Sequence, residues 1–248
     1  MNRREMLRVL GSAGVIGTVP GLLWTRPTCQ TPVDYRVQGA GPALIAFDRA
    51  PKGYFDRFAD RYRVIIMDYP PRDDSQAFVD SFTPARVCAD VLAVADAAGA
   101  DRFAWYGFSW GGGVGLQLAA RTNRLTALVC GGWPPLGAQY RDMVTVTGRD
   151  PGSRIYDTFY RPLQDWPERE AVSKFTCPRM TFAGSKDVIV AYGHTFPHGP
   201  TIAAHREELE RMGWTVRLVD GFDHELGARP DVVVPLVREF LDPLLLRG

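Results

Sequence analysis

The sequence feature that most constrains the fold is the segment from Phe103 to Gly115, FAWYGFSWGGGVG. It passes from an apolar run through a Gly-x-Ser-x-Gly motif centred on Ser109 into small residues with helical spacing. The two flanking glycines remove the Cβ atoms that would collide in a sharp strand-to-helix turn. Such a turn would hold the Ser109 hydroxyl above a sheet edge. Because the short motif also arises by chance as a glycine-rich turn, its context in the chain has to decide.

Composition and charge favour one globular α/β domain. The chain has 248 residues, of which 46% are hydrophobic and 23% charged, and these are ordinary values for a globular protein. The net charge is +1, and the basic residues form no block, so we expect no nucleic-acid partner. The four cysteines are far apart and lack metal-ligand spacing, which predicts no metal site; Cys88 and Cys130 fit small core positions.

The first 30 residues have the pattern of an export signal. Arg3-Arg4 is followed by hydrophobic residues and an uncharged run over 9–25, as in a twin-arginine leader. That run is too short and too weakly apolar for a membrane span, so we expect none in the mature chain. The leader predicts a periplasmic or extracellular protein. The alternative is a cytoplasmic protein with an amphipathic extension.

Beyond the leader, apolar runs alternate with helical patterns, which predicts a mostly parallel sheet with helices on both faces. The expected strands cover 33–37, 43–47, 63–68, 102–107, 125–130, 179–183 and 214–219. The expected helices cover 54–58, 83–99, the segment after Ser109 to about 122, 201–213 and a closing segment from about 232. The fold class is therefore α/β, with one domain over 31–248.

One long segment interrupts this alternation. From about 134 to 177 the chain is rich in prolines and aromatic residues and has no clear period. An insertion of this length between strands favours a small cap over an active site. A packed aromatic subcore in a surface excursion explains the same pattern, and the two are compatible.

A serine nucleophile needs a histidine base and an acid that orients the histidine. His224 directly follows the last expected strand, where a loop can return over the sheet edge. His194 and His198 lie in a loop further from their strand and are the alternatives, whereas His205 falls inside a helix.

The acid should follow the strand before the last one. Asp187 does so in the segment AGSKD. Its alternative role is to cap a loop. Asp223 is the fallback acid, but neighbouring residues rarely point at each other's rings. We therefore predict the catalytic order Ser109, Asp187, His224.

Over residues 33–246 these features resemble the α/β-hydrolase superfamily: the elbow at Ser109, the acid at Asp187 beyond a cap, and the histidine at position 224. The resemblance implies a cofactor-free enzyme. Esterases, lipases, thioesterases and peptidases are typical members. Epoxide hydrolases and dehalogenases carry aspartate at the elbow, so a serine there argues against both.

The sequence departs from the superfamily at two places. Members usually show His-Gly-x-Pro after the first central strand, whereas this chain reads Asp48-Arg49-Ala50-Pro51. By position, the Ala50 and Trp110 N–H groups would form the oxyanion hole. The charge of Asp48 would oppose an oxyanion unless Arg49 or another cation neutralised it. The segment 69–75 also lacks the glycines that relatives often have.

The sequence thus predicts a serine hydrolase that cleaves an ester-like bond in a small or medium substrate through an acyl-enzyme. Two alternatives remain. One is a binding protein without catalysis on the same scaffold, suggested by Asp48-Arg49; the other is a cofactor-free lyase or haloperoxidase. The substrate-binding residues and the substrate are not specified by the sequence.

Overall fold

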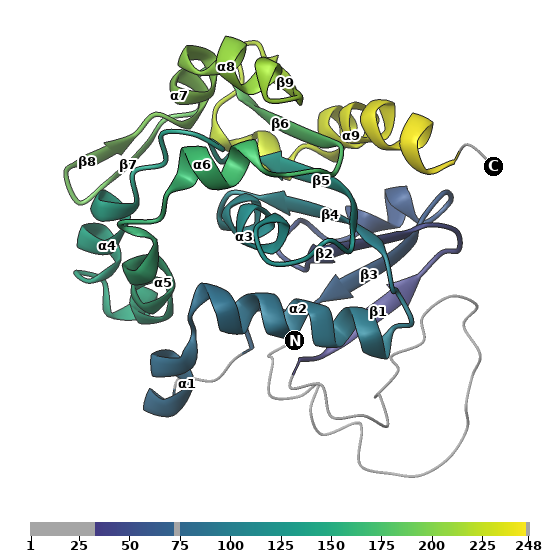
Figure 1. Ribbon diagram of the computed structural model, residues 1–248, viewed down its shortest axis with the longest axis horizontal. Helices are drawn as coiled ribbons and strands as arrows, with labels where there is room; N and C mark the ends of the chain where they lie inside the picture. The colour runs from purple at the N-terminus through teal and green to yellow at the C-terminus, as the bar shows by residue number, and fades with distance from the viewer. Residues whose placement is uncertain (1–32, 72–74, 247–248) are drawn as a thin grey trace, which may run out of the picture.

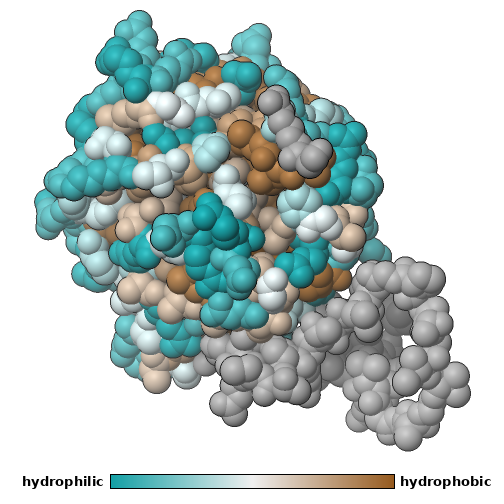
Figure 2. All heavy atoms as spheres, turned by 45° about the vertical axis from the view of Figure 1, so that its right-hand side comes forward, coloured by the Kyte–Doolittle hydropathy of each residue, from teal (hydrophilic) through white to brown (hydrophobic). Residues whose placement is uncertain are grey.

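A computed structural model describes residues 33–71 and 75–246 of the chain. The predicted leader over 1–30 lies outside the described residues. Within them, no helix combines the length and apolar character needed to cross a membrane. Figure 2 shows one face of the molecule, on which hydrophilic residues surround smaller hydrophobic areas.

The core of the molecule is a seven-stranded sheet in the order β1-β3-β2-β4-β5-β6-β9. The strands pair in parallel except at the edge, where β1 runs antiparallel to β3. Their bounds are β1 (Tyr35–Gln38), β2 (Ala43–Phe47), β3 (Arg63–Met67), β4 (Phe103–Phe108), β5 (Leu125–Gly131), β6 (Arg179–Gly184) and β9 (Trp214–Val219). A separate hairpin joins β7 (Ile189–Ala191) to β8 (His194–Phe196). The predicted α/β class with a mostly parallel sheet is confirmed.

Helices cover both faces of this sheet (Figure 1). They are α1 (Gln76–Ser81), α2 (Pro84–Ala97), α3 (Trp110–Ala119), α4 (Tyr140–Thr147), α5 (Arg154–Tyr160), α6 (Glu168–Ser173), α7 (His198–Ala204), α8 (Arg206–Arg211) and α9 (Pro230–Leu245). The helices α2, α3 and α8 bury apolar residues on one face, and α9 with the 3₁₀ turn Phe55–Phe58 does so on the other.

The burial pattern of the central strands follows from their place in the sheet. All five residues of β2 are buried, with Ile45 on the α2 side and Leu44 and Ala46 on the α9 side. Because successive side chains of a strand point to opposite faces, a strand covered on both sides must be apolar throughout. The continuous apolar runs in the sequence therefore mark central strands.

Four local features differ from the expectations. The helix expected over 201–213 is two helices, α7 and α8, which meet at His205. The loop expected after Asp187 contains the β7–β8 hairpin, and α1 forms in a segment with no predicted helix. The closing helix starts at Pro230 and contains Pro235 and Pro243 in its interior.

Candidate active site

Ser109 occupies a strained turn between β4 and α3. Its backbone has φ 55° and ψ −126°, in the region that non-glycine residues rarely adopt. A Cβ at Gly107 would come within 2.0 Å of the Gly111 carbonyl oxygen, so this position requires glycine. The Ser109 N–H donates to the Gly131 carbonyl of β5 at 2.8 Å. The turn is thus fixed on the neighbouring strand.

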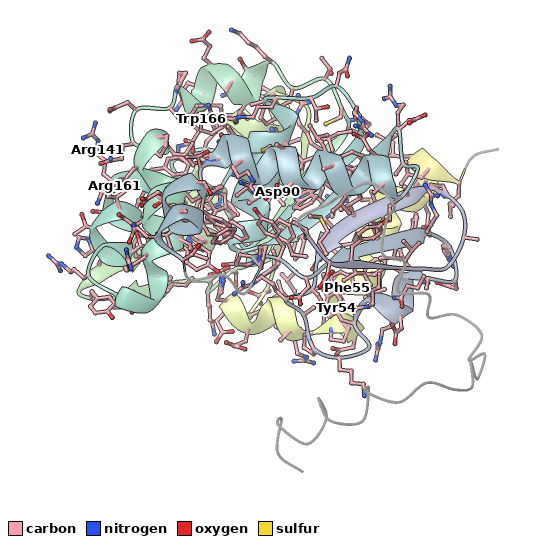
Figure 3. The ribbon with its side chains drawn as sticks, turned by 90° about the horizontal axis from the view of Figure 1, so that it is seen from below. Tyr54, Phe55, Asp90, Arg141, Arg161 and Trp166 are labelled. Atoms are coloured by element: carbon pink, nitrogen blue, oxygen red, sulfur yellow. The ribbon has the colours of Figure 1, made fainter. Side chains whose placement is uncertain are left out.

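The elbow opens onto a cavity of about 490 Å³ at the carboxyl end of the central strands. Ser109, His224, Trp110 and Ala50 all line it. The remaining lining side chains are mainly apolar or aromatic, including Phe47, Phe55, Tyr106, Phe108, Met143, Tyr156 and Tyr160. In Figure 3 the labelled Phe55 lies next to Tyr54.

His224 and Asp187 form a hydrogen-bonded pair beside the cavity. The His224 Nδ1 lies 2.9 Å from Oδ1 and 3.1 Å from Oδ2 of Asp187. The Asp187 side chain is fully buried, and that of His224 is 24% exposed. Within 33–71 and 75–246, no hydrogen bond joins the Ser109 hydroxyl to the imidazole, although both side chains reach the same cavity wall.

The loops that carry the two residues are tied together because β6 and β9 are neighbours in the sheet. The Ser185 N–H donates to the Val219 carbonyl at 2.9 Å, and the Lys186 N–H donates to the Phe222 carbonyl at 2.8 Å. The Ser185 hydroxyl accepts from the Gly221 N–H at 2.9 Å. The positions of Asp187 and His224 are therefore set by backbone contacts as well as by their own bond.

Asp223 and two of the other histidines have partners elsewhere. The Asp223 carboxylate accepts from the Glu225 N–H at 3.0 Å and caps a short 3₁₀ turn. The His194 Nδ1 lies 3.1 Å from Asp142, and the His205 Nδ1 lies 2.9 Å from the Thr201 carbonyl. None of the three meets Ser109 at the cavity wall.

His198 belongs to the site, although sequence spacing gave it only second place. It is buried beside Asp187, with its Nδ1 atom 3.7 Å from Oδ1 of the carboxylate. One ligand atom each from Asp187, His198 and His224 lies within 4.8 Å of the others, a spacing that could hold a metal ion. Cysteine spacing could not reveal this group, because three distant segments contribute to it.

The two expected oxyanion donors are free of other partners. In the described part of the chain, neither the Trp110 nor the Ala50 N–H donates a hydrogen bond. The negative charge of Asp48 is paired, because Arg36 of β1 holds the carboxylate in a two-point ion pair. Arg49, which lines the cavity, has no ion-pair partner among residues 33–71 and 75–246.

Trp110 also links the elbow to the segment between β5 and β6. Its ring stacks on Phe47 at 5.3 Å and meets Tyr156 and Phe159 of α5 edge-on at 5.4 and 5.3 Å. Arginines on the outer side of this segment, such as Arg141 and Arg161 in Figure 3, are mostly exposed. Helix α5 thus presents Tyr156 and Tyr160 to the cavity, and α4 presents Met143 and Thr147.

Comparison with known proteins agrees with this fold. A family model described as the alpha/beta hydrolase fold matches residues 50–146, which include the elbow but neither Asp187 nor His224. A sequence comparison with curated proteins gave no match. The chain has the fold of the α/β-hydrolase superfamily.

Solved structures share this fold. An α/β hydrolase enzyme from a lagoon-sediment metagenome of Mar Chica, Morocco, is 18% identical with a TM-score of 0.64, covering 88% of this chain and 99% of that one. A structure in a study of carboxylesterases of the thaumarchaeon Nitrososphaera gargenis is 14% identical (TM-score 0.61; coverage 90% and 98%). A structure in a study of epoxide hydrolases from hot-environment metagenomes is 16% identical (TM-score 0.58; coverage 89% and 98%). Such likenesses show the fold, which hosts several chemistries.

Proposed function

We propose that this protein is a serine hydrolase that cleaves an ester-like bond in a small or medium substrate. The observation that carries the proposal is the buried Asp187 bonded to His224 at the wall of the cavity into which the strained Ser109 elbow opens. A carboxylate on Nδ1 leaves Nε2 of the imidazole available as a base, which is the arrangement that activates a serine hydroxyl.

In the proposed reaction, the Ser109 oxygen attacks the ester carbonyl carbon while its proton passes to His224 Nε2. The Asp187 carboxylate stabilises the imidazolium, and the Trp110 and Ala50 N–H groups stabilise the oxyanion. The tetrahedral intermediate then breaks its bond to the leaving oxygen, which takes the proton from His224. Water deprotonated by His224 attacks the acyl-enzyme, and the acid product leaves with Ser109 restored.

The cavity favours a substrate with an apolar acyl or aromatic group. Its lining is mainly aromatic and aliphatic, and its size suits a small molecule. The neighbouring carboxylesterases and epoxide hydrolases differ in chemistry. Serine at the elbow favours the esterase-type reaction for this chain, because it supplies an alkoxide nucleophile and not a carboxylate.

A fluorophosphonate probe and a panel of p-nitrophenyl esters test the proposal. We expect labelling and hydrolysis by the wild-type protein and loss of both in Ser109→Ala. Ser173→Ala is the matched control, since this serine lies on α6 and, among the described residues, its hydroxyl donates only to the Glu170 carbonyl. A folded wild-type protein that neither labels nor hydrolyses any ester would instead support the binding-protein alternative. Ester activity that survives in Ser109→Ala would favour a different reaction type.

We also propose export through the twin-arginine-like segment at Arg3-Arg4, with a cytoplasmic protein as the alternative. A reporter fused to residues 1–30 in a bacterium with this export route tests it. We expect the reporter in the periplasm or medium, and in the cytoplasm when both arginines are changed to lysine. Equal cytoplasmic retention of both fusions would contradict the proposal.

A further inference from the structure

His198 is held against the buried acid by its own helix. It is the first residue of α7, and the next residue, Gly199, donates its N–H to the Asp187 carbonyl at 3.0 Å. A Cβ at Gly199 would come within 2.2 Å of the Gly184 carbonyl oxygen. The start of α7 therefore packs on the Asp187 loop at a distance that only glycine permits.

The contact leaves one polar atom of His198 without a partner. Its side chain is 5% exposed, and Nδ1 makes no hydrogen bond within the described residues. The carboxylate of Asp187, 3.7 Å away, is the acidic group that faces it. The His224 ring lies 5.5 Å from the His198 ring, and Trp133 closes another side at 5.6 Å.

Asp187 has room for a second donor. In the described part of the structure its two carboxylate oxygens accept only from His224 Nδ1. A carboxylate can accept several hydrogen bonds, and a buried one is costly to leave short of donors. The orphan nitrogen of His198 is therefore beside an acceptor that lacks donors.

At neutral pH the His198 imidazole carries one ring N–H proton, on either Nδ1 or Nε2. Burial lowers the pKa of His198 to about 4, against the opposing effects of Asp187 and the Gly132 backbone. Because Nδ1 makes no hydrogen bond among the described residues, the hydrogen bond of His198 to the Gly132 backbone belongs to Nε2. A proton on Nδ1 would exchange this neutral bond for one to the charged Asp187 carboxylate. Charge-assisted hydrogen bonds are about twice as strong as neutral ones, so the Nδ1 position is favoured.

We propose that His198 is a positioning residue that carries its proton on Nδ1 and donates it to Asp187. The Nδ1–Oδ1 separation is 3.7 Å, which a hydrogen bond would shorten to about 3 Å. Two imidazoles, whose rings lie 5.5 Å apart, would then both donate to the carboxylate. The orientation of Asp187 toward His224 would depend on both.

The tautomer is read directly by ¹⁵N NMR of the histidine side chains in the wild-type protein at pH 7. We expect His198 to show a protonated Nδ1 and an unprotonated Nε2. The reverse pattern would overturn the proposal. This measurement needs no catalytic activity. The tautomer of His198 does not depend on the proposed hydrolase function, whereas its effect on catalysis rests on that function.

Two variants separate donation from packing. His198→Asn keeps an N–H donor near the position of Nδ1, and His198→Phe keeps the ring without a donor. We expect the Phe variant to move the ¹H resonance of the His224 Nδ1–H group downfield, since His224 becomes the sole donor to Asp187 and its hydrogen bond strengthens. The Asn variant should stay near wild type. His205→Asn is the control, because that ring bonds to Thr201 away from the site.

With an ester substrate, the Phe variant should lose roughly tenfold in kcat at unchanged KM, the size expected for one hydrogen bond to a charged group. The Asn variant should recover most of this loss. Wild-type behaviour of the Phe variant, or an equal loss in both variants, would assign His198 a packing role only. If the wild-type protein cleaved no ester, the proposed function would fail while the NMR results still decided the role of His198.

Discussion

The Nδ1 atom of His224 lies 2.9 Å from Oδ1 of Asp187, although 37 positions separate the two residues in the chain. The sheet makes this meeting possible, because the two residues follow β6 and β9, which are adjacent and parallel. The carboxyl ends of such strands meet at one edge, where functional groups collect. The pair therefore follows from strand order.

The ion pair between Arg36 and Asp48 should protect the proposed oxyanion hole. Arg36→Gln would leave the Asp48 charge unpaired two positions from Ala50. We expect kcat for an ester to fall by about fivefold, which corresponds to roughly 1 kcal/mol between charges near a protein surface.

Adding Asp48→Asn to Arg36→Gln should restore the rate, because the unpaired charge is gone. Arg141→Gln is the control, as it breaks the exposed pair of Arg141 with Asp165 on the outer side of the segment between β5 and β6. A double variant as slow as Arg36→Gln alone would show that the pair acts through structure and not through charge.

His198 should make the protein sensitive to acid. Its pKa falls from 6.5 to about 4 on folding, so between these values the unfolded chain binds a proton that the native state does not. The stability contribution is present above pH 6.5 and is lost as the pH falls toward 4, by roughly 3 kcal/mol at most. We expect Tm to fall less steeply over this window in His198→Phe than in wild type. Parallel curves would contradict the assignment.

Glu168 should have the opposite effect. Its carboxylate accepts from the Gly137 N–H at 2.6 Å, near the start of the segment between β5 and β6. Burial raises the pKa of Glu168 from 4.5 to about 7. The native state therefore binds the extra proton between these values, and stability falls as the pH rises through them.

Glu168→Gln removes this ionisation and keeps an oxygen acceptor. We expect its Tm to exceed that of wild type most clearly above pH 7. Glu170→Gln is the matched control, because this side chain on the same helix is exposed and pairs with Lys174. A pH-independent difference between wild type and Glu168→Gln would refute the prediction.

The elbow should tolerate no side chain at position 107. Gly107→Ala places a Cβ within 2.0 Å of the Gly111 carbonyl oxygen, a backbone clash that no rotamer relieves. We expect a loss of about 3 kcal/mol or more in the free energy of unfolding, measured with urea. Gly152→Ala, where the nearest described atom would be 3.5 Å away, should change it little. Equal stability of the two variants would contradict the strained geometry.

Much of the fold was predictable because buried parallel strands must be apolar throughout. The runs at 43–47 and 179–183 could be read on this basis, and both are central strands. The β7–β8 hairpin was missed because three-residue strands give too little alternation. The break at His205 was missed because an amphipathic pattern continues across it.

The candidate site was predictable where a residue follows a strand directly. Ser109 directly follows β4, and Asp187 and His224 lie in the loops after β6 and β9. Ser109 and His224 line one cavity, and Asp187 bonds to His224. His198 follows no sheet strand; a helix that packs through Gly199 brings it to Asp187. The partner of Asp48 was equally hidden, because Arg36 meets it only through the antiparallel pairing of β1 with β3.

The stacking of Trp110 between Phe47 and the α5 rings has a consequence for how molecules enter. Helix α5 packs on the residue next to Ser109, so moving α5 away from the cavity would disturb that residue. We therefore expect α5 to stay in place when a small molecule enters, with Tyr156 and Tyr160 as a fixed part of the cavity wall.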